Sequence, residues 1–211
     1  MRKMVKILWK GLINAYDAAF SIVLANIFFV VLSIPVITLP LAVAGLYYTN
    51  FQIASGESVD WKTFFVGIKR CWWAGIRWTV VNGLVIFSLV FYFFFFVDRG
   101  EFWAIALLGL DLGVLGFWII MQFLMFPMML IQEKQAYLLA LRNTLVFIVH
   151  WPGFSFTFLM TIILLVVASL FFPPLWIFLS IGLIAYLGSY AVYYRIESDR
   201  HPELFSDPSH E

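Results

Sequence analysis

Long stretches without charged residues alternate with short charged segments along the chain. Residues 18–56 and residues 143–194 contain no Asp, Glu, Lys or Arg. A helix needs about 20 apolar residues to cross a hydrocarbon core of ~30 Å, so each stretch is long enough to cross twice. Proline pairs within residues 35–40 and 171–174 divide these stretches where such a chain would turn.

The same pattern predicts an all-α integral membrane protein, because an apolar run of this length pairs all its backbone groups internally as a helix. About six membrane-embedded helices, arranged as three hairpins, are expected at residues 19–34, 41–54, 78–97, 102–132, 154–170 and 175–194. Their outer turns fall at residues 35–40, 98–101 and 171–174. The second helix carries Tyr47, Tyr48, Asn50 and Gln52, so it is expected either to span or to be half-embedded. Residues 1–198 are treated as one transmembrane domain and residues 199–211 as a polar cytoplasmic tail.

The positions of the basic residues predict the orientation. With six crossings, Arg99 is the one of the 13 lysines and arginines that falls on the outer side. The positive-inside rule then places both termini in the cytoplasm, in a multi-pass protein of a cytoplasmic membrane. The basic segment at residues 1–10 is expected to be an uncleaved anchor, because no small-residue cleavage site follows it.

A basic amphipathic segment precedes the third expected span. Ser58 or Asp60 can cap a helix that runs to about Trp78. Apolar side chains share one face of it: Phe64, Phe65, Ile68, Trp72 and Ile76. Four cations share the other face and are candidate headgroup contacts: Lys62, Lys69, Arg70 and Arg77. This pattern predicts an interfacial helix on the cytoplasmic side, in contact with membrane lipids, or a simple elbow that orients the next span. A second such helix is expected at residues 135–147, with Arg142 and Asn143.

Four polar residues fall deep inside the expected spans and form the candidate intramembrane site: Asp111, Asn26, Asn82 and Gln122. An ionisable group at this depth is a functional candidate, because a buried charge costs several kcal/mol unless it is paired or wet. Asp111 is expected to be neutral and hydrogen-bonded within the bundle, with Ser88 or the Ser and Thr residues of the last two spans as neighbours, or to face a wet cavity. The amides can tie helices together or line a polar path. Gly109 and Gly113 form a GxxxG motif beside Gly116, which places Asp111 close to a predicted packing seam.

Composition narrows the class of protein. Apolar residues make up 64% of the chain, aromatic residues 20% and charged residues 12%, with a mean hydropathy of +0.97. These values exclude a disordered chain, a nucleic-acid binder with a basic face and an ordinary soluble enzyme. Cys71 is the single cysteine, so no internal disulfide forms. No glycine-rich phosphate loop, nucleophile elbow or metal-ligand motif is present, so no cofactor or metal is expected and the chain is predicted not to be an enzyme.

Four short segments carry a family resemblance: residues 24–40 (LANIFFVVLSIPVITLP), 42–48 (AVAGLYY), 55–57 (SGE) and 61–65 (WKTFF). In this order they resemble the YesL-like family of bacterial multi-pass membrane proteins, and residues 140–144 (ALRNT) are similar to its second elbow. Leu39 stands where that family usually has Gly. The family has no established biochemical activity, and its members are often encoded beside genes for sugar uptake and polysaccharide degradation. The resemblance therefore implies a helper or regulator of carbohydrate uptake, with a sugar transporter or sensor as partner.

Two functional hypotheses follow. The first is an accessory, scaffold or regulatory protein that packs against a transporter or sensor. The second is a small-solute carrier or channel with Asp111 in its pathway. A packed, dry interior favours the first hypothesis, and a polar cavity that reaches Asp111 favours the second.

Overall fold

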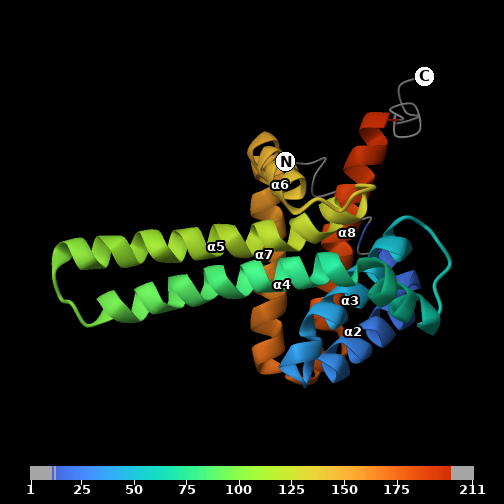
Figure 1. The fold of residues 1–211 in the computed structure, drawn as a ribbon, viewed down its shortest axis with the longest axis horizontal. Helices are drawn as coiled ribbons and strands as arrows, with labels where there is room; N and C mark the ends of the chain where they lie inside the picture. Colours follow the sequence, from blue (N-terminus) through green and yellow to red (C-terminus); the bar gives the residue numbers. More distant parts are fainter. Residues whose placement is uncertain (1–10, 12, 201–211) are drawn as a thin grey trace.

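The computed structural model describes residues 11 and 13–200, and that part of the chain contains helices and no strand. In chain order the elements are α2 (Ala19–Ser33), the 3-10 turn η1 (Val36–Thr38), α3 (Leu39–Ala54), α4 (Trp61–Val97), α5 (Phe102–Leu130), α6 (Tyr137–His150), α7 (Pro152–Phe171), the π-helical η2 (Trp176–Ser180) and α8 (Ile181–Arg200). The all-α prediction is thereby confirmed (Figure 1).

Five helical segments of the described chain are long and apolar enough to cross a membrane: Val36–Ala54, Trp61–Val97, Phe102–Leu130, Pro152–Phe171 and Ile177–Ile196. The chain therefore has the composition and helix lengths of a multi-pass membrane protein. The first expected span is the exception, because α2 has 15 residues.

The three expected breaks between helices are confirmed at their predicted positions. The turn at the first break is stabilised by local hydrogen bonds. The Thr38 hydroxyl donates to the carbonyl oxygens of Leu32 and of Pro35, the latter at 2.8 Å. Pro40 then lies in the first turn of α3, where a missing backbone N–H costs nothing. Residues 98–101 separate α4 from α5, and residues 172–175 separate α7 from η2.

The expected break near Trp78 is wrong. The amphipathic segment and the span that follows it form one continuous helix, α4, of 37 residues. Asp60, rather than Ser58, caps it: the Thr63 backbone N–H donates to Asp60 Oδ1 at 3.0 Å, and the Asp60 N–H donates to Thr63 Oγ1 at 3.1 Å. The hydrogen bond from the Thr63 side chain lowers the pKa of Asp60. No proline occurs between Asp60 and Pro127, so nothing interrupts the helix near Trp78. The second expected amphipathic helix does form separately, as α6.

α3 is the central helix, and it interlocks most closely with α4. A Cβ added to Gly45 would lie 2.7 Å from the Phe64 ring, and one added to Gly67 would lie 2.6 Å from the Tyr48 side chain. A Cβ on Gly75 would lie 2.2 Å from the Pro40 carbonyl oxygen. These three glycines therefore fix the separation of the two helices.

The central position of α3 explains its polar residues. Every residue from 42 to 50 is buried against neighbouring helices, which include α2, α4, α5 and α8. The Thr49 hydroxyl donates to the Gly45 carbonyl at 2.9 Å, and Asn50 Nδ2 donates to the Leu46 carbonyl at 2.9 Å. A helix that faces protein on all sides tolerates polar groups that lipid would reject.

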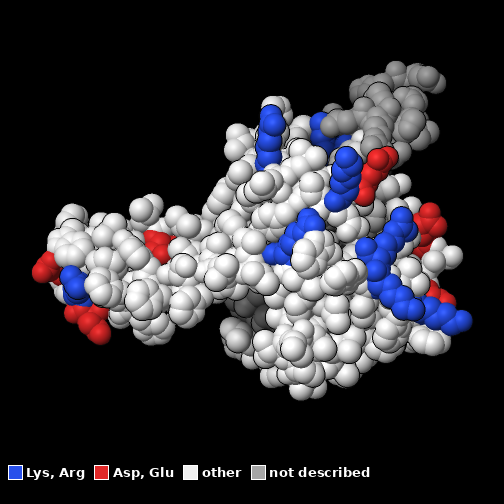
Figure 2. All heavy atoms as spheres, viewed as in Figure 1, with Lys and Arg blue, Asp and Glu red and all other residues white. Residues whose placement is uncertain are grey.

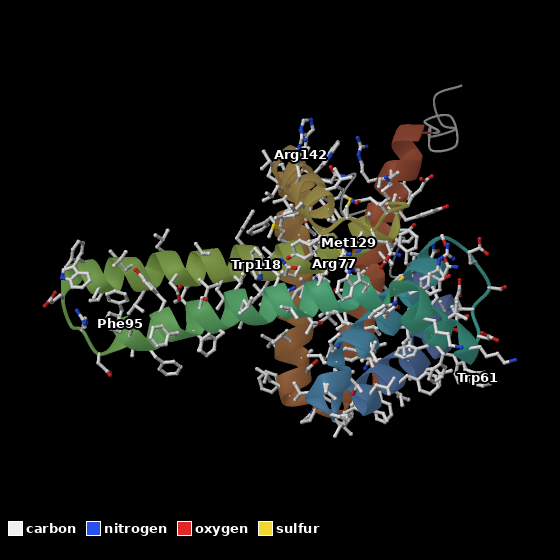
Figure 3. All side chains as sticks on the ribbon, viewed as in Figure 1. Trp61, Arg77, Phe95, Trp118, Met129 and Arg142 are labelled. Atoms are coloured by element: carbon white, nitrogen blue, oxygen red, sulfur yellow. The ribbon has the colours of Figure 1, made fainter. Side chains whose placement is uncertain are left out.

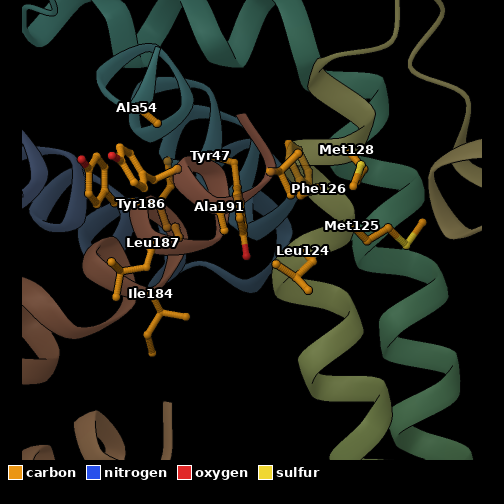
Figure 4. Close-up of a cluster of buried hydrophobic side chains, with 14 of the residues drawn as sticks. Tyr47, Ala54, Leu124, Met125, Phe126, Met128, Ile184, Tyr186, Leu187 and Ala191 are labelled. Carbon is orange, nitrogen blue, oxygen red and sulfur yellow. The ribbon is translucent and has the colours of Figure 1, made fainter. Parts of the chain in front are cut away.

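The core of the body is aromatic and rich in methionine. Figure 4 shows Tyr47 of α3 between the α8 cluster, which includes Tyr186, and the α5 cluster, which includes Phe126 and Met125. The Tyr47 and Phe126 rings are stacked with centroids 4.7 Å apart. Large rings and flexible thioethers fill such an irregular space well.

The α4–α5 hairpin projects away from this body, and α7 crosses it at its base (Figure 1). Only 6% of the residues in an apolar 18-residue stretch of α4 are buried, whereas 67% are buried in the corresponding stretch of the last span, Ile177–Ile196. At the tip, the Arg99 guanidinium lies 4.7 Å from the Phe95 ring centroid, and Figure 3 shows Phe95 near this end. The part of the hairpin beyond its base is thus an apolar arm that projects from the body (Figure 1).

Candidate functional site

Asn26 holds α2 against the start of α8. Its Nδ2 donates to the Ile177 carbonyl at 2.6 Å, and its Oδ1 accepts from the Gly182 N–H at 2.7 Å. Ile177 belongs to the π-helical turn η2 and Gly182 follows it, at a place where the regular i to i−4 pairing is interrupted. Asn26 is fully buried. Its amide therefore stabilises an irregular turn, and the structure places it away from the other predicted polar residues.

Asn82 and Gln122 lie together and join α4 to α5. Asn82 Nδ2 donates to Gln122 Oε1 at 3.0 Å and to the Trp78 carbonyl at 2.8 Å. Trp118 Nε1 donates to Asn82 Oδ1 at 2.9 Å. Figure 3 shows Trp118 at the base of the hairpin, where it meets the body. Trp118 was missed as a site residue, although a tryptophan deep in a span signals a polar partner for its N–H.

Three buried donors surround this network without a hydrogen-bond partner in the described part of the chain. They are Gln122 Nε2, Trp78 Nε1 and the Tyr47 hydroxyl. The Tyr47 and Trp78 rings both pack on Phe126, with centroids 4.7 and 5.9 Å from it. The junction of α3, α4 and α5 therefore contains buried donors that the helices leave unpaired.

Asp111 lies on the side of α5 that faces α4, seven residues before Trp118. It is 6% exposed, and within residues 11 and 13–200 it makes no hydrogen bond or ion pair. The hydroxyl of Ser88, one of its expected neighbours, donates to the Leu84 carbonyl of its own helix at 2.8 Å. Seven residues of helix rise about 10 Å, so Asp111 is separate from the Asn82 network. Of the four intramembrane candidates, only Asn82 and Gln122 are therefore in contact, while Asn26 and Asp111 each lie elsewhere, so the four do not line one path.

No other helix of the described chain packs on the glycines of α5 that were predicted to form a packing seam. A Cβ added to Gly109, Gly113 or Gly116 would meet nothing within 4 Å. On a helix these three glycines lie on the face opposite Asp111, because two residues turn the helix by about 200°. Gly83 of α4 is equally open. Gly45, Gly182 and Gly188, by contrast, do lie against neighbouring helices.

The four candidate headgroup residues, Lys62, Lys69, Arg70 and Arg77, are all exposed. Aromatic rings accompany them: the Arg77 guanidinium lies 5.1 Å from the Trp73 ring, and Lys62 Nζ lies 5.7 Å from the Trp61 ring. Arg70 Nη1 also donates to the Tyr48 hydroxyl at 3.4 Å. Figure 2 shows Lys and Arg atoms over the body, while the far end of the hairpin carries acidic groups and one basic group. This arrangement suits the interface between lipid headgroups and water.

In the described part of the chain, no group of three or more His, Cys, Asp or Glu side chains is placed to hold a metal ion. Cys71 is buried, and its Sγ accepts from Gln135 Nε2 at 3.4 Å.

Comparison of the chain with protein-family models, with curated proteins and with solved structures gave no match. The resemblance to the YesL-like family therefore stays a prediction. A functional proposal has to be based on the arrangement of the helices and their side chains.

Proposed function

We propose that this chain is a non-enzymatic accessory protein of a bacterial cytoplasmic membrane, which binds another membrane protein through its α4–α5 hairpin. One observation carries the proposal: the hairpin projects from the body, and only 6% of the residues in an apolar 18-residue stretch of α4, and 17% in one of α5, are buried. The body, by contrast, is packed around α3 with aromatic and methionine side chains. A rigid body with a projecting arm is suited to docking.

The open glycines support a protein helix, rather than lipid alone, as the neighbour of the arm. Glycine costs a helix about 1 kcal/mol relative to alanine. Lipid chains cover leucine as readily as glycine, whereas a partner helix approaches closely only over small side chains. Gly109, Gly113 and Gly116 form one such stripe on the outward face of α5. The family resemblance is the sole basis for naming a sugar transporter or sensor as the partner.

Substitution of the stripe tests this proposal. Gly109→Leu combined with Gly113→Leu fills the outward face of α5, so we expect the partner that co-purifies from native membranes to be reduced at least tenfold. Gly83→Leu is the matched control, because Gly83 is equally open but belongs to α4. Equal recovery of the partner by both variants would show that the stripe takes no part in docking.

The membrane layout is part of the proposal: six crossings, both termini cytoplasmic, and the four cations with their tryptophans at the inner interface. The distribution of Lys and Arg supports it. α2 rises only about 22 Å, less than a ~30 Å core, so its crossing needs the helical residues 13–17 or local thinning of the bilayer.

Cysteine labelling tests this layout in a Cys71→Ala background. We expect Thr38→Cys in η1 to react with an impermeant thiol reagent from outside and Ser58→Cys before α4 to react only from inside. Labelling of both positions from the same side would exclude the hairpin of α2 and α3.

A small-solute carrier is the second candidate, and the buried, unpartnered carboxyl of Asp111 is the observation that favours it. Asp111→Asn separates the two functions, because asparagine has nearly the same shape but cannot hold a proton or a charge. The docking function predicts normal abundance and an unchanged cellular phenotype. Loss of the phenotype at normal abundance would favour the carrier.

A further inference from the structure

A pocket of about 280 Å³ lies where α2 begins and α3 ends, remote from the hairpin. Three parts of the chain line it: residues 14–18 before α2, residues 53–59 at the end of α3 and beyond it, and one face of α8. Its polar lining consists of Asn14, Asp17, Glu57, Tyr186 and Tyr190. None of the predicted site residues belongs to it.

The end of α3 fixes Glu57 at the pocket. Gly56 adopts φ +80°, the left-handed conformation that ends helices. The Glu57 N–H donates to the Gln52 carbonyl at 3.0 Å, and the Gly56 N–H donates to the Ile53 carbonyl at 3.1 Å. This is the pattern of a Schellman motif, which turns the chain sharply. The C-terminal end of a helix also carries partial negative charge, which adds to that of the carboxylate.

Two tyrosines of α8 supply the buried wall. Tyr186 is 1% exposed and Tyr190 is 8% exposed, and their rings are stacked with centroids 5.9 Å apart. Neither hydroxyl has a hydrogen-bond partner in the described part of the chain. Figure 4 shows Tyr186 on the side of the core near Ala54, which also lines the pocket. Two phenol groups, each more than nine-tenths buried, thus line the pocket without a protein partner.

The charges of the lining select the ligand. Asp17 and Glu57 are both acidic, and among the lining residues that the structure describes there is no Lys or Arg. Carboxylate and phenol oxygens accept N–H bonds, and the faces of tyrosine rings attract cations. Ca²⁺ takes six to eight oxygen ligands, and the carboxylates of Asp17 and Glu57 are the charged ones among the described lining residues, so Ca²⁺ is the competing cation for the test. An anion would meet two like charges.

We propose that this pocket binds a small organic ammonium ion, held between the carboxylates of Asp17 and Glu57 and the rings and hydroxyls of Tyr186 and Tyr190. The ammonium group comes either from a free amine in solution or from the ethanolamine headgroup of a lipid. Both sources offer the same cation to the same residues.

Calorimetry on the full chain in nanodiscs tests the proposal with ethanolamine as the probe and ethylene glycol as its neutral analogue. We expect ethanolamine to bind and ethylene glycol not to bind. Asp17→Asn combined with Glu57→Gln should weaken ethanolamine binding at least tenfold, and Tyr186→Phe should weaken it several-fold. Glu133→Gln is the matched control, since Glu133 is an exposed acid outside the pocket.

Three results would overturn the proposal: no ethanolamine binding by the wild type, equal binding by the double variant and the control, or tighter binding of Ca²⁺ than of ethanolamine. Size-exclusion chromatography confirms that each variant is folded. Native mass spectrometry in nanodiscs of phosphatidylethanolamine or phosphatidylcholine separates the sources. Retention of phosphatidylethanolamine that depends on Asp17 and Glu57 assigns the headgroup, and amine binding without such retention assigns a free amine.

Discussion

Gly75→Ala should destabilise the protein by about 3 kcal/mol or more, the upper range for overpacking a close interface. The added methyl carbon would lie 2.2 Å from the Pro40 carbonyl oxygen and 3.2 Å from the Ala44 side chain. The first of these atoms belongs to the backbone, so no rotation of a side chain relieves the clash. α3 and α4 would have to separate, and α3 contacts most of the body. Thermal unfolding of the purified protein in detergent measures the effect.

Gly83→Ala is the control for this substitution, on the same helix two turns further along. Its methyl group would meet nothing within 4 Å. Alanine stabilises a helix by up to about 1 kcal/mol relative to glycine, so this variant should unfold at the wild-type temperature or slightly above it. Similar losses in both variants would show that Gly75 does not set the separation of the helices.

Asn26→Leu should cost about 2 kcal/mol or more, because each buried polar group left unpaired costs about 1–3 kcal/mol. The substitution removes the partner of the Ile177 carbonyl and of the Gly182 N–H together.

Unfolding midpoints in detergent compare this variant with Asn143→Leu, which removes an exposed amide of α6. We expect the Asn143 variant to match the wild type. A stable Asn26→Leu protein with altered solute permeation would contradict the structural role and assign Asn26 to a pathway.

Helix positions could be predicted from the sequence because proline and charge act locally. The breaks at residues 35–40, 98–101 and 171–174 follow from single residues whose effect on the backbone does not depend on the fold. The expected break near Trp78 had no such residue. That break was predicted because a segment with several Lys and Arg residues gives way to an apolar one near Trp78. A helix can continue through such a change in composition, as α4 does.

The packing of the helices could not be predicted in the same way. The GxxxG motif at Gly109 and Gly113 is open, whereas Gly67 and Gly75 lie against α3 and Cys71 between them is buried. These three small residues, at spacings of four, were a signal for close approach, but the cations among them favoured an interfacial helix. Small residues show where helices can meet, and only the fold shows which of them do.

The polar residues show the same difference. That Asn26, Asn82 and Gln122 need partners follows from their depth. Their actual partners are a π-helical turn, a tryptophan and each other, and these depend on tertiary contacts. Tyr186 and Tyr190 were missed, because tyrosines at the end of a span are normally part of an aromatic belt.

Site-specific photo-crosslinking in native membranes tests the docking function most directly. A photoreactive residue in place of Gly113 probes the outward face of the hairpin, and one in place of Val149 probes an equally exposed site on α6. The docking function predicts a discrete adduct with one multi-pass membrane protein from position 113, none from position 149, and loss of the adduct when Gly109→Leu is added. Lipid adducts alone from position 113, at the level seen from position 149, would contradict it.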